Sequence, residues 1–322
     1  MSITRKATMK MACIRENPAG TYVAPNVLLP FTSQDANQEW ESIPDNSVVG
    51  VAFKNLPVQG VRAVRGPIEI QADLNTLPVM LLAAFGAVGT GVYSLPTTAN
   101  AEALSFCLLN GVKTNKYAGC FLNNFNFKSS AKEDAKITAD ILGYKAEGRD
   151  DTAFPTTSIS EGSRILHQQA DSVNGSGYVR IGDQGNALAA GDNVAVKEIG
   201  FGINWGFDTD HYNSMESLIP LSGAAGVPEA SFKLVLNRHD TDQYHAWRDA
   251  HTHLQAEIKY YVSATKSLLI QVPNFILRPK LSGDEIPSVD LDIIVGRNGI
   301  GTDYSNANMA FVTPIRVTHA NA

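Results

Sequence analysis

The strongest constraint in this sequence of 322 residues is an internal repeat. Residues 120–143 match residues 270–293 at a fixed offset of 150 positions, so that Asn124 falls on Asn274 and Asp140 falls on Asp290 without a gap. Each copy alternates apolar and polar residues on either side of a polar turn, which is typical of two paired strands. A repeat at this distance predicts two related β domains rather than a short-period solenoid.

Each half is expected to run from a strand through a short helix into further strands and the repeated hairpin. In the first half, Thr76 and Pro78 favour a helix start and Gly86 favours its end. In the second half, a helix is expected at 241–250 after a strand at 231–237. The sequence therefore predicts a mainly β fold with short helices, a β-rich α+β class built from two tandem sandwich-like domains. The expected division is 1–150, a loop-rich connection at 151–193, and 194–322.

The overall charge limits the classes of partner. The formal net charge is −6, whereas a protein that grips nucleic acid needs clustered Lys and Arg. An acidic surface is still compatible with DNA that slides past without adhering. The longest apolar run, at 79–89, is about half of the ~20 residues that a membrane helix needs, and the N-terminal residues do not resemble a secretory signal. We therefore expect folding in a cytoplasm and no membrane insertion.

Residues that could carry chemistry form no recognised motif. Three cysteines, Cys13, Cys107 and Cys120, cannot all pair and have no metal-binding spacing, so buried thiols are expected. One stretch is rich in possible metal ligands, but its spacing favours capping or surface roles over a metal site: His239, Asp240, Asp242, His245, His251 and His253. No phosphate loop and no nucleophile elbow is present. We assign no catalytic, cofactor-binding or metal-binding residue and expect a protein that is not an enzyme.

The order of these features resembles a known family. The segments that carry the likeness are residues 16–21 (ENPAGT), 66–86, 235–249 and the two repeat copies around Asn124 and Asn274. Together they resemble the major tail tube proteins of long-tailed bacteriophages, in particular those whose subunit contains two copies of the tube fold. The resemblance implies β-sandwich domains that contribute strands to an inner β-barrel shared by a ring of subunits. Six domains close such a ring, which implies a homotrimer with pseudo-sixfold symmetry, or alternatively a hexamer.

The resemblance also implies a function and two sets of site residues. Stacked rings would form the hollow tail tube of the virion, through which the genome is ejected into the host. Its partners would be the chain itself, a tape-measure protein, tail tip and terminator proteins, and DNA in transit. The polar faces of the repeat strands would line the lumen, with these residues: Lys136, Asp140, Asp290 and Asp292. The polar arm at 32–46 would reach the next ring through Gln34, Asp35, Asn37, Glu39 and Trp40.

Other interpretations remain open at this point. Ordinary outer-surface alternation would give the same strand pattern, and the arm at 32–46 could be a plain loop. A tail terminator, connector or capsid decoration protein would form a single ring or a capsid-bound trimer rather than tubes. A metal-dependent hydrolase would use the histidine stretch. A carbohydrate-binding sandwich would need an aromatic platform, for which Trp40, Trp205 and Trp247 are too scattered.

Overall fold

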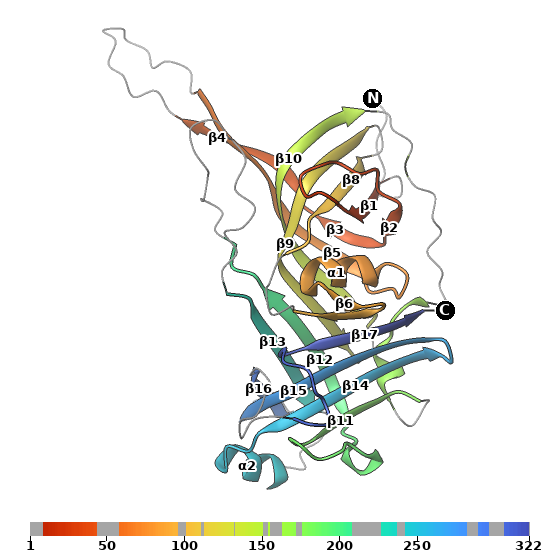
Figure 1. The fold of residues 1–322 in the computed structure, drawn as a ribbon, viewed down its shortest axis with the longest axis vertical. Coiled ribbons are helices and arrows are strands. Elements are labelled where there is room, and N and C mark those ends of the chain that lie inside the picture. The colour runs from red at the N-terminus through yellow and green to blue at the C-terminus, as the bar shows by residue number, and fades with distance from the viewer. Residues whose placement is uncertain are drawn as a thin grey trace, which may run out of the picture.

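The protein is mainly β. The computed structural model describes residues 9–43, 58–95, 101–110, 113–131, 133–150, 154, 163–171, 176–207, 227–236, 242–281, 289–295 and 306–321. Every recorded strand pair is antiparallel. The predicted fold class is therefore confirmed at the level of a β-rich chain with short helices, as the ribbon in Figure 1 shows.

The elements of the first half are β1 (Met9–Arg15), β2 (Val27–Leu29), β3 (Phe31–Gln34), β4 (Asn37–Ile43), β5 (Val58–Gln71), α1 (Leu77–Phe85), β6 (Ala87–Gly89), β7 (Val92–Ser94), β8 (Leu104–Asn110), β9 (Thr114–Ser130) and β10 (Lys136–Asp150). Those of the second half are η3 (His167–Ala170), β11 (Tyr178–Asp183), η4 (Ala190–Asp192), β12 (Val196–Asn204), β13 (Glu229–Leu236), α2 (Asp242–Asp249), β14 (Leu254–Ser263), β15 (Lys266–Leu281), β16 (Val289–Val295) and β17 (Arg316–Asn321).

The two halves pair their strands in the same order. In the first half the neighbours run β1, β8, β9, β10 and β5, with β3 and β4 on the outer side of β5. In the second half they run β11, β14, β15, β16 and β13, with β12 on the outer side of β13. A helix follows the β5 strand in one half and the β13 strand in the other. The strand order therefore repeats along the chain.

The ungapped alignment of the two repeat copies is wrong in register. Asp140 lies opposite Asn124, but Asp290 lies opposite Lys280 rather than opposite Asn274. In the first hairpin the last recorded pair before the turn is Lys128 with Lys136, and in the second it is Leu281 with Val289. The turn thus lies three residues later than the alignment requires, because β15 continues further before the chain reverses.

The two halves are joined by direct strand pairing. Residues 198–204 of β12 pair with residues 124–130 of β9. β8 pairs with β9 only as far as Cys120, so β12 lies along the remaining length of β9. Aromatic side chains fill the interior beneath this junction: Phe125 and Phe201 pack against Phe85 of α1 with ring centroids 5.8 and 6.1 Å away. One hydrophobic core therefore runs through both halves.

The first helix is buried as its composition predicts. Thr76 stands at its N-cap and Gly86 ends it with φ of 71°, where a residue with a Cβ would be strained. The Thr76 hydroxyl does not cap the helix but donates to the carbonyl of Asp73, so the expected capping role of its side chain is wrong. Six of the nine residues of α1 are buried.

The last strand connects elements from both halves. β17 pairs with β15 on one side and with the short strand β7 on the other. The strand β11 lies within the 151–193 segment, which the sequence analysis assigns to a loop-rich connection, and it pairs with β14. The longest element described in that segment therefore belongs to the sheet of the second half.

Candidate functional site

A polar sheet face carries residues of both halves. Directly opposed residues share one face of a sheet, and one such row can be followed across five strands. Lys136 lies opposite Lys128, Lys128 opposite Gly200, Gly200 opposite Lys233, and Lys233 opposite Asp292. Asp140 begins a parallel row four residues further along β10: it lies opposite Asn124, which lies opposite Asn204. The strand pairing therefore places predicted lumen residues of both repeat copies on one continuous surface.

Of the predicted lumen residues, only those of the first half have described side chains. Lys136 is half-buried and Asp140 is exposed, while their neighbours Ile137 and Ile141 are buried on the opposite side. The backbone of Asp290 and Asp292 is placed in β16, but their side chains lie outside the described part, as do those of Val289 and Leu291. The alternation predicted for β10 is confirmed.

The basic residues of the polar face are paired with acids. The carboxylate of Glu198 in β12 forms ion pairs with Lys128 and Lys233, with Nζ-to-oxygen distances of 3.0 and 3.1 Å. Burial raises the pKa of Glu198, but the hydrogen bonds from both lysines outweigh it, and the pKa lies below its usual value. This carboxylate bridges strands of both halves at the β9–β12 junction.

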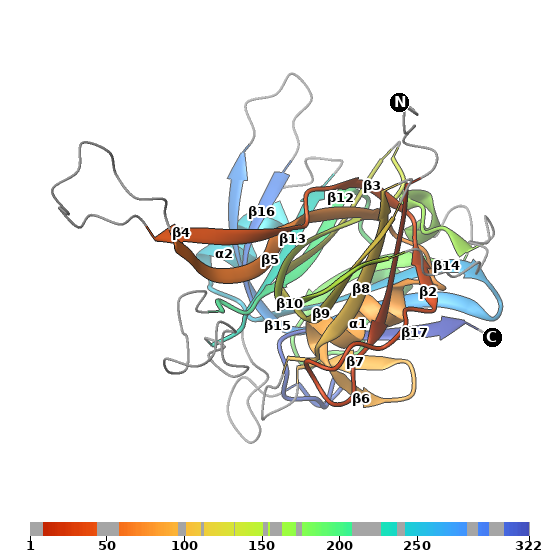
Figure 2. The same cartoon turned by 90° about the horizontal axis from the view of Figure 1, so that it is seen from above.

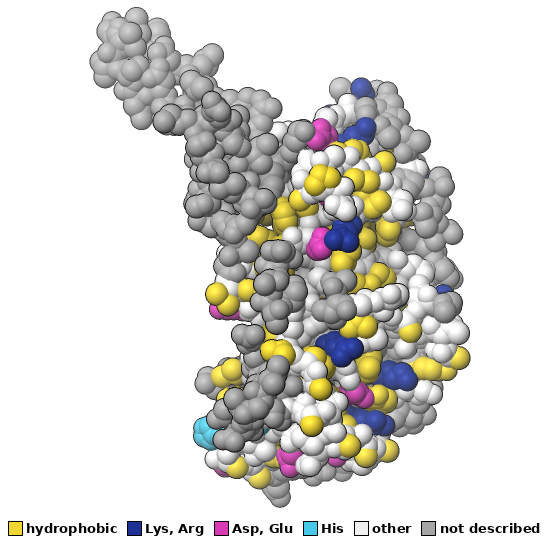
Figure 3. Space-filling model, viewed as in Figure 1, with side chains coloured by type: hydrophobic (Ala, Val, Ile, Leu, Met, Phe, Trp, Pro, Cys, Tyr) yellow, Lys and Arg dark blue, Asp and Glu magenta, His cyan; other side chains and the backbone are white. Residues whose placement is uncertain are grey.

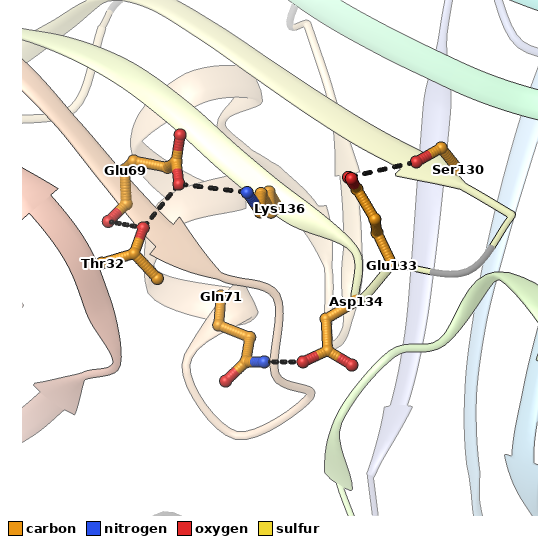
Figure 4. Close-up of polar contacts among 7 residues, drawn as sticks. All are labelled: Thr32, Glu69, Gln71, Ser130, Glu133, Asp134 and Lys136. Carbon is orange, nitrogen blue, oxygen red and sulfur yellow. Dashed lines mark hydrogen bonds and ion pairs between the residues drawn. The ribbon is translucent and has the colours of Figure 1, made fainter.

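A second polar cluster lies at the end of β5 and β10. In Figure 4, Lys136 approaches Glu69 at 3.4 Å and the Thr32 hydroxyl donates to the same carboxylate at 2.6 Å. The bond from Thr32 and the charge of Lys136 together lower the pKa of Glu69 in spite of some burial. Beside them Gln71 donates to Asp134. Lys128, Lys136 and Lys233 are therefore paired with carboxylates and do not form a basic patch that would bind phosphates.

Charges elsewhere are also mixed in sign. On the face seen in Figure 3, the described Lys and Arg side chains alternate with Asp, Glu and hydrophobic ones, without a single-sign patch over the described surface.

In the described part of the chain no helix is both long and apolar enough to cross a bilayer.

The predicted inter-ring arm is part of an extended hairpin. Gln34 ends β3, Asp35 follows it, and Asn37 begins β4, which lies along β5 from Asn37 to Ile43. The Asp35 amide donates to the Pro67 carbonyl at 2.9 Å, so this part of the arm is held to β5. Glu39 and Trp40 lie in β4, but their side chains fall outside the described part. Figures 1 and 2 both show the β4–β5 hairpin extending away from the body.

Two strand edges lack a neighbour among the described residues. β14 covers one edge of β15 only as far as Phe275, and residues 276–281 have β16 on the other edge alone. In the same way, β3 and β4 have β5 on one side and no recorded strand on the other. In the repeated strand order, β15 corresponds to β9, and β3–β4 correspond to β12. The two uncovered edges are therefore the counterparts of the β9 and β12 edges, which pair with each other.

A half-open cavity of about 440 Å³ lies beside the turn between β9 and β10. Its interior is mostly apolar and its mouth carries exposed polar groups. His167 lines the cavity, but both of its ring nitrogens already have partners: Nδ1 lies 3.0 Å from Ser129 Oγ and Nε2 lies 2.9 Å from the Val196 carbonyl. It therefore has no ring nitrogen left to bind a ligand. We refer to this space as the η3 cavity; its lining includes Glu133, Leu166, Gln168, Ala170, Asp171, Val179, Ala195 and Ile199.

The histidine stretch is only partly described. His239 and Asp240 lie outside the described residues, and the side chains of Asp242 and His245 do as well. His251 is exposed, whereas His253 Nδ1 lies 2.8 Å from the Asn274 amide oxygen. Among the described residues, no three His, Cys, Asp or Glu side chains converge as metal ligands.

The three cysteines are buried and unpaired, as predicted. Burial raises the pKa of Cys107 to about 12 and raises those of Cys13 and Cys120 as well. Thiols with raised pKa values and no exposure are poor nucleophiles.

The sequence analysis missed a buried carboxylate. Glu16, in the 16–21 segment, is 3% exposed, and it accepts hydrogen bonds from Ser105 at 2.7 Å, Gly119 N at 2.8 Å and Gly20 N at 2.6 Å. It therefore anchors the turn after β1 to β8 and β9. The turn residues around it were recognisable, but nothing local indicated that its charge is buried.

Comparisons with known proteins give no identification. A scan against protein-family models found no match, and a search of curated proteins found no similar sequence. The interpretation of the two edges and the polar face therefore depends on geometry.

Proposed function

We propose that this protein is the subunit of a bacteriophage tail tube. In this proposal the chain contains two related β domains, and each supplies strands to the wall of a ring. The first supplies β9, β10, β5 and, along the outer side of β5, β3 followed by β4; the second supplies β15, β16, β13 and β12. Rings stack into a hollow tube in the virion, through which the genome enters the host. The chain has a structural role, no catalytic role and no cofactor.

The observation that carries this proposal is the β9–β12 junction. Within one chain, β12 of the second half completes the edge of β9 in the first. The corresponding strands β15 and β3–β4 have vacant edges among the described residues. Unpaired strand edges invite pairing with another chain, and closure into a ring removes them. The β15 edge of one subunit would therefore receive β3–β4 of the next.

Repetition of one junction gives the ring. Each subunit would contain one junction within itself and make one equivalent junction with its neighbour. Three subunits then close a ring with pseudo-sixfold symmetry, and a ring of six chains is the alternative. Pro279 lies in the length of β15 that β14 leaves uncovered, and proline within a sheet is found mainly in edge strands and at bulges.

The polar sheet face would form the inner wall. Lys136, Asp140, Asp290 and Asp292 then face the lumen, with the lysines neutralised by Glu69 and Glu198. A wall whose cations are already paired, in a chain of net charge −6, gives DNA phosphates no strong site to adhere to. The same wall would contact a tape-measure protein during assembly, and the ends of the tube would contact tail tip and terminator proteins.

Electron microscopy of the purified, concentrated protein at neutral pH tests this proposal. We expect rings with threefold or pseudo-sixfold averages, and stacked hollow cylinders. A single discrete ring that never elongates would instead favour a terminator, connector or decoration protein. A persistent monomer that also fails to add to isolated tail tips would contradict the proposal.

A backbone substitution tests the proposed edge directly. The amide of Asp35 points to β5, and strand alternation then directs the amide of Gln38 to the vacant edge. Gln38→Pro removes that donor but no recorded bond to β5, so the monomer should fold normally and fail to close rings. Gln38→Ala, which keeps the amide, should assemble like the unmodified protein. Normal rings from the proline variant would exclude pairing through this part of β4.

A further inference from the structure

The η3 cavity lies at the opposite end of β5 from the tip of the β4–β5 hairpin. Figure 4 shows Gln71, the last residue of β5, contacting Asp134, and both Glu133 and Asp134 belong to the cavity lining. The hairpin tip begins where β4 ends at Ile43 and β5 begins at Val58. The fourteen residues of β5 separate these two places by roughly 43 Å, at about 3.3 Å per residue. Both features thus occupy opposite ends of one long strand.

The chemistry of the cavity is that of a receptor for an apolar segment with one cation. Its interior is formed by half-buried and buried side chains that include Leu166, Val179 and Ile199, and it is large enough for several side chains. Exposed carboxylates of Glu133 and Asp171 stand in its lining. A ligand that buries apolar area and places a positive charge near these acids would satisfy both parts.

The segment between Ile43 and Val58 contains both parts. Residues 44–57 read PDNSVVGVAFKNLP: the apolar run at 48–53 is followed directly by Lys54, and the one acid, Asp45, lies on the other side of the run. We propose that this segment of one copy docks in the η3 cavity of a copy in the next ring. The inference rests on the proposed tube, because stacking places the hairpin end of one ring against the cavity end of its neighbour. It assigns the inter-ring contact to residues 44–57 rather than to the whole arm at 32–46, and it names the receptor, which the tube alone does not specify.

A bulky side chain at the mouth of the cavity should weaken the stacking of rings and leave the single ring intact. Ala195 is exposed in the lining, so Ala195→Trp adds a large side chain there without replacing a core residue. We expect single rings to persist and the concentration needed for tubes to rise about tenfold. Ala310→Trp, at an exposed position between β16 and β17 that lies outside the lining of the η3 cavity and outside both proposed edges, is the matched control and should form tubes normally. Tubes of normal length from Ala195→Trp would overturn the docking.

A charge exchange tests the proposed ion pair. Lys54→Glu should raise the concentration needed for tubes roughly two- to fivefold, the range for an exposed ion pair, and Glu133→Lys in the same chain should restore it. Glu133 is exposed and its recorded partner is Ser130 at 3.3 Å, so its replacement leaves the fold intact. If Glu133→Lys deepened the defect of Lys54→Glu, the two residues would not meet.

Cross-linking separates failure of the docking from failure of the tube. One preparation carries Gln168→Cys at the cavity and the other carries Gly50→Cys in the segment, and a short bismaleimide joins them only if copies meet head to tail. The three native cysteines are buried and should not react. Rings without this cross-link would overturn the docking alone, and a cross-link without rings would uphold the docking while contradicting the tube. A cross-link to Ser2→Cys instead would make the basic N-terminal segment the occupant and overturn the proposal.

Discussion

The two helices occupy corresponding places in the two halves, and they differ in what covers them. α1 packs on β9, and its Ala84 carbonyl accepts a bond of 3.0 Å from Trp205, which follows β12 of the other half. α2 packs on β15, where its Tyr244 and Trp247 contact each other and remain only half-buried. An open space of about 360 Å³ lies between α2 and β15. The first helix is covered by other described elements of the chain, whereas no described element covers the corresponding side of the second.

This difference explains the sequences of the helices. α1 carries no charged residue because β1, β7, β9 and Trp205 surround it, whereas α2 (DQYHAWRD) carries charges that water can reach. In the proposed ring, β4 of the next subunit would approach α2 as β12 and Trp205 approach α1. The four predictions below compare contacts of the two halves and of the regions that join them.

Removing the aromatic contact of the completed junction should have the largest effect. Phe85 is fully buried against Phe125 and Phe201, so Phe85→Ala should lower the free energy of unfolding by about 3–5 kcal/mol. Trp247→Ala in α2 should lower that of the monomer by less, about 2 kcal/mol, because Trp247 is only partly buried. Urea titration of the monomeric protein measures both. Equal losses would show that α2 is as well covered as α1.

The polar anchors of the halves offer a reciprocal exchange. The first half buries the carboxylate of Glu16, whereas the second buries the amide of Gln255, whose nitrogen donates to the carbonyls of Asp183 and Asn186. Gln255→Glu places an acceptor against two carbonyls and should cost about 3 kcal/mol, and Glu16→Gln should cost about 2 kcal/mol. Glu102→Gln, which alters the exposed pair with Arg15, is the control and should cost under about 1 kcal/mol. Unfolding curves in urea measure all three, and a neutral Gln255→Glu would contradict the bonding described.

The ion pairs across the junction should contribute less. Glu198→Gln leaves Lys128 and Lys233 without their shared counter-ion and should cost about 1 kcal/mol at low salt, and less at high salt. Because the folded-state pKa of Glu198 is lowered, its contribution is present above pH 4.5 and is lost as the pH falls through that lowered value. The variant should therefore lose less stability on acidification than the unmodified protein. Glu229→Gln, at an exposed position of β13, should not show this salt dependence.

Local patterns predicted much of the fold. The strand expected at 231–237 is β13, in which Phe232, Leu234 and Leu236 are all buried. The first helix was found from Pro78, Gly86 and the apolar run between them, and the helix expected at 241–250 is α2. These signals are local, since each depends on residues a few positions apart.

The tertiary pairings could not be predicted in the same way. The three-residue shift of the β15–β16 turn and the β9–β12 junction depend on partners far apart in the chain, for which alternation gives no register. The burial of Glu16 has the same origin, because its bond partners Ser105 and Gly119 come from β8 and β9. Of the candidate site, the sequence supplied the polar residues of the repeat strands, but not the two vacant edges that give them a proposed use.

The smallest effect is expected where β17 ties the halves together. His319 Nε2 contacts the Leu74 carbonyl at 2.7 Å, and burial lowers the pKa of this histidine although that bond opposes the shift. The unfolded chain then binds a proton more readily, so this part of the stability is complete above about pH 6.5 and declines as the pH falls below it. His319→Gln should flatten the pH dependence of the melting temperature between pH 6.5 and 5. Asn321→Ala, which removes a non-titrating contact with the same carbonyl at 3.4 Å, should lower stability equally at every pH. If the melting temperature of His319→Gln changed with pH as much as that of the unmodified protein, the acid sensitivity would belong to another group. The contacts of β17 would then not depend on pH.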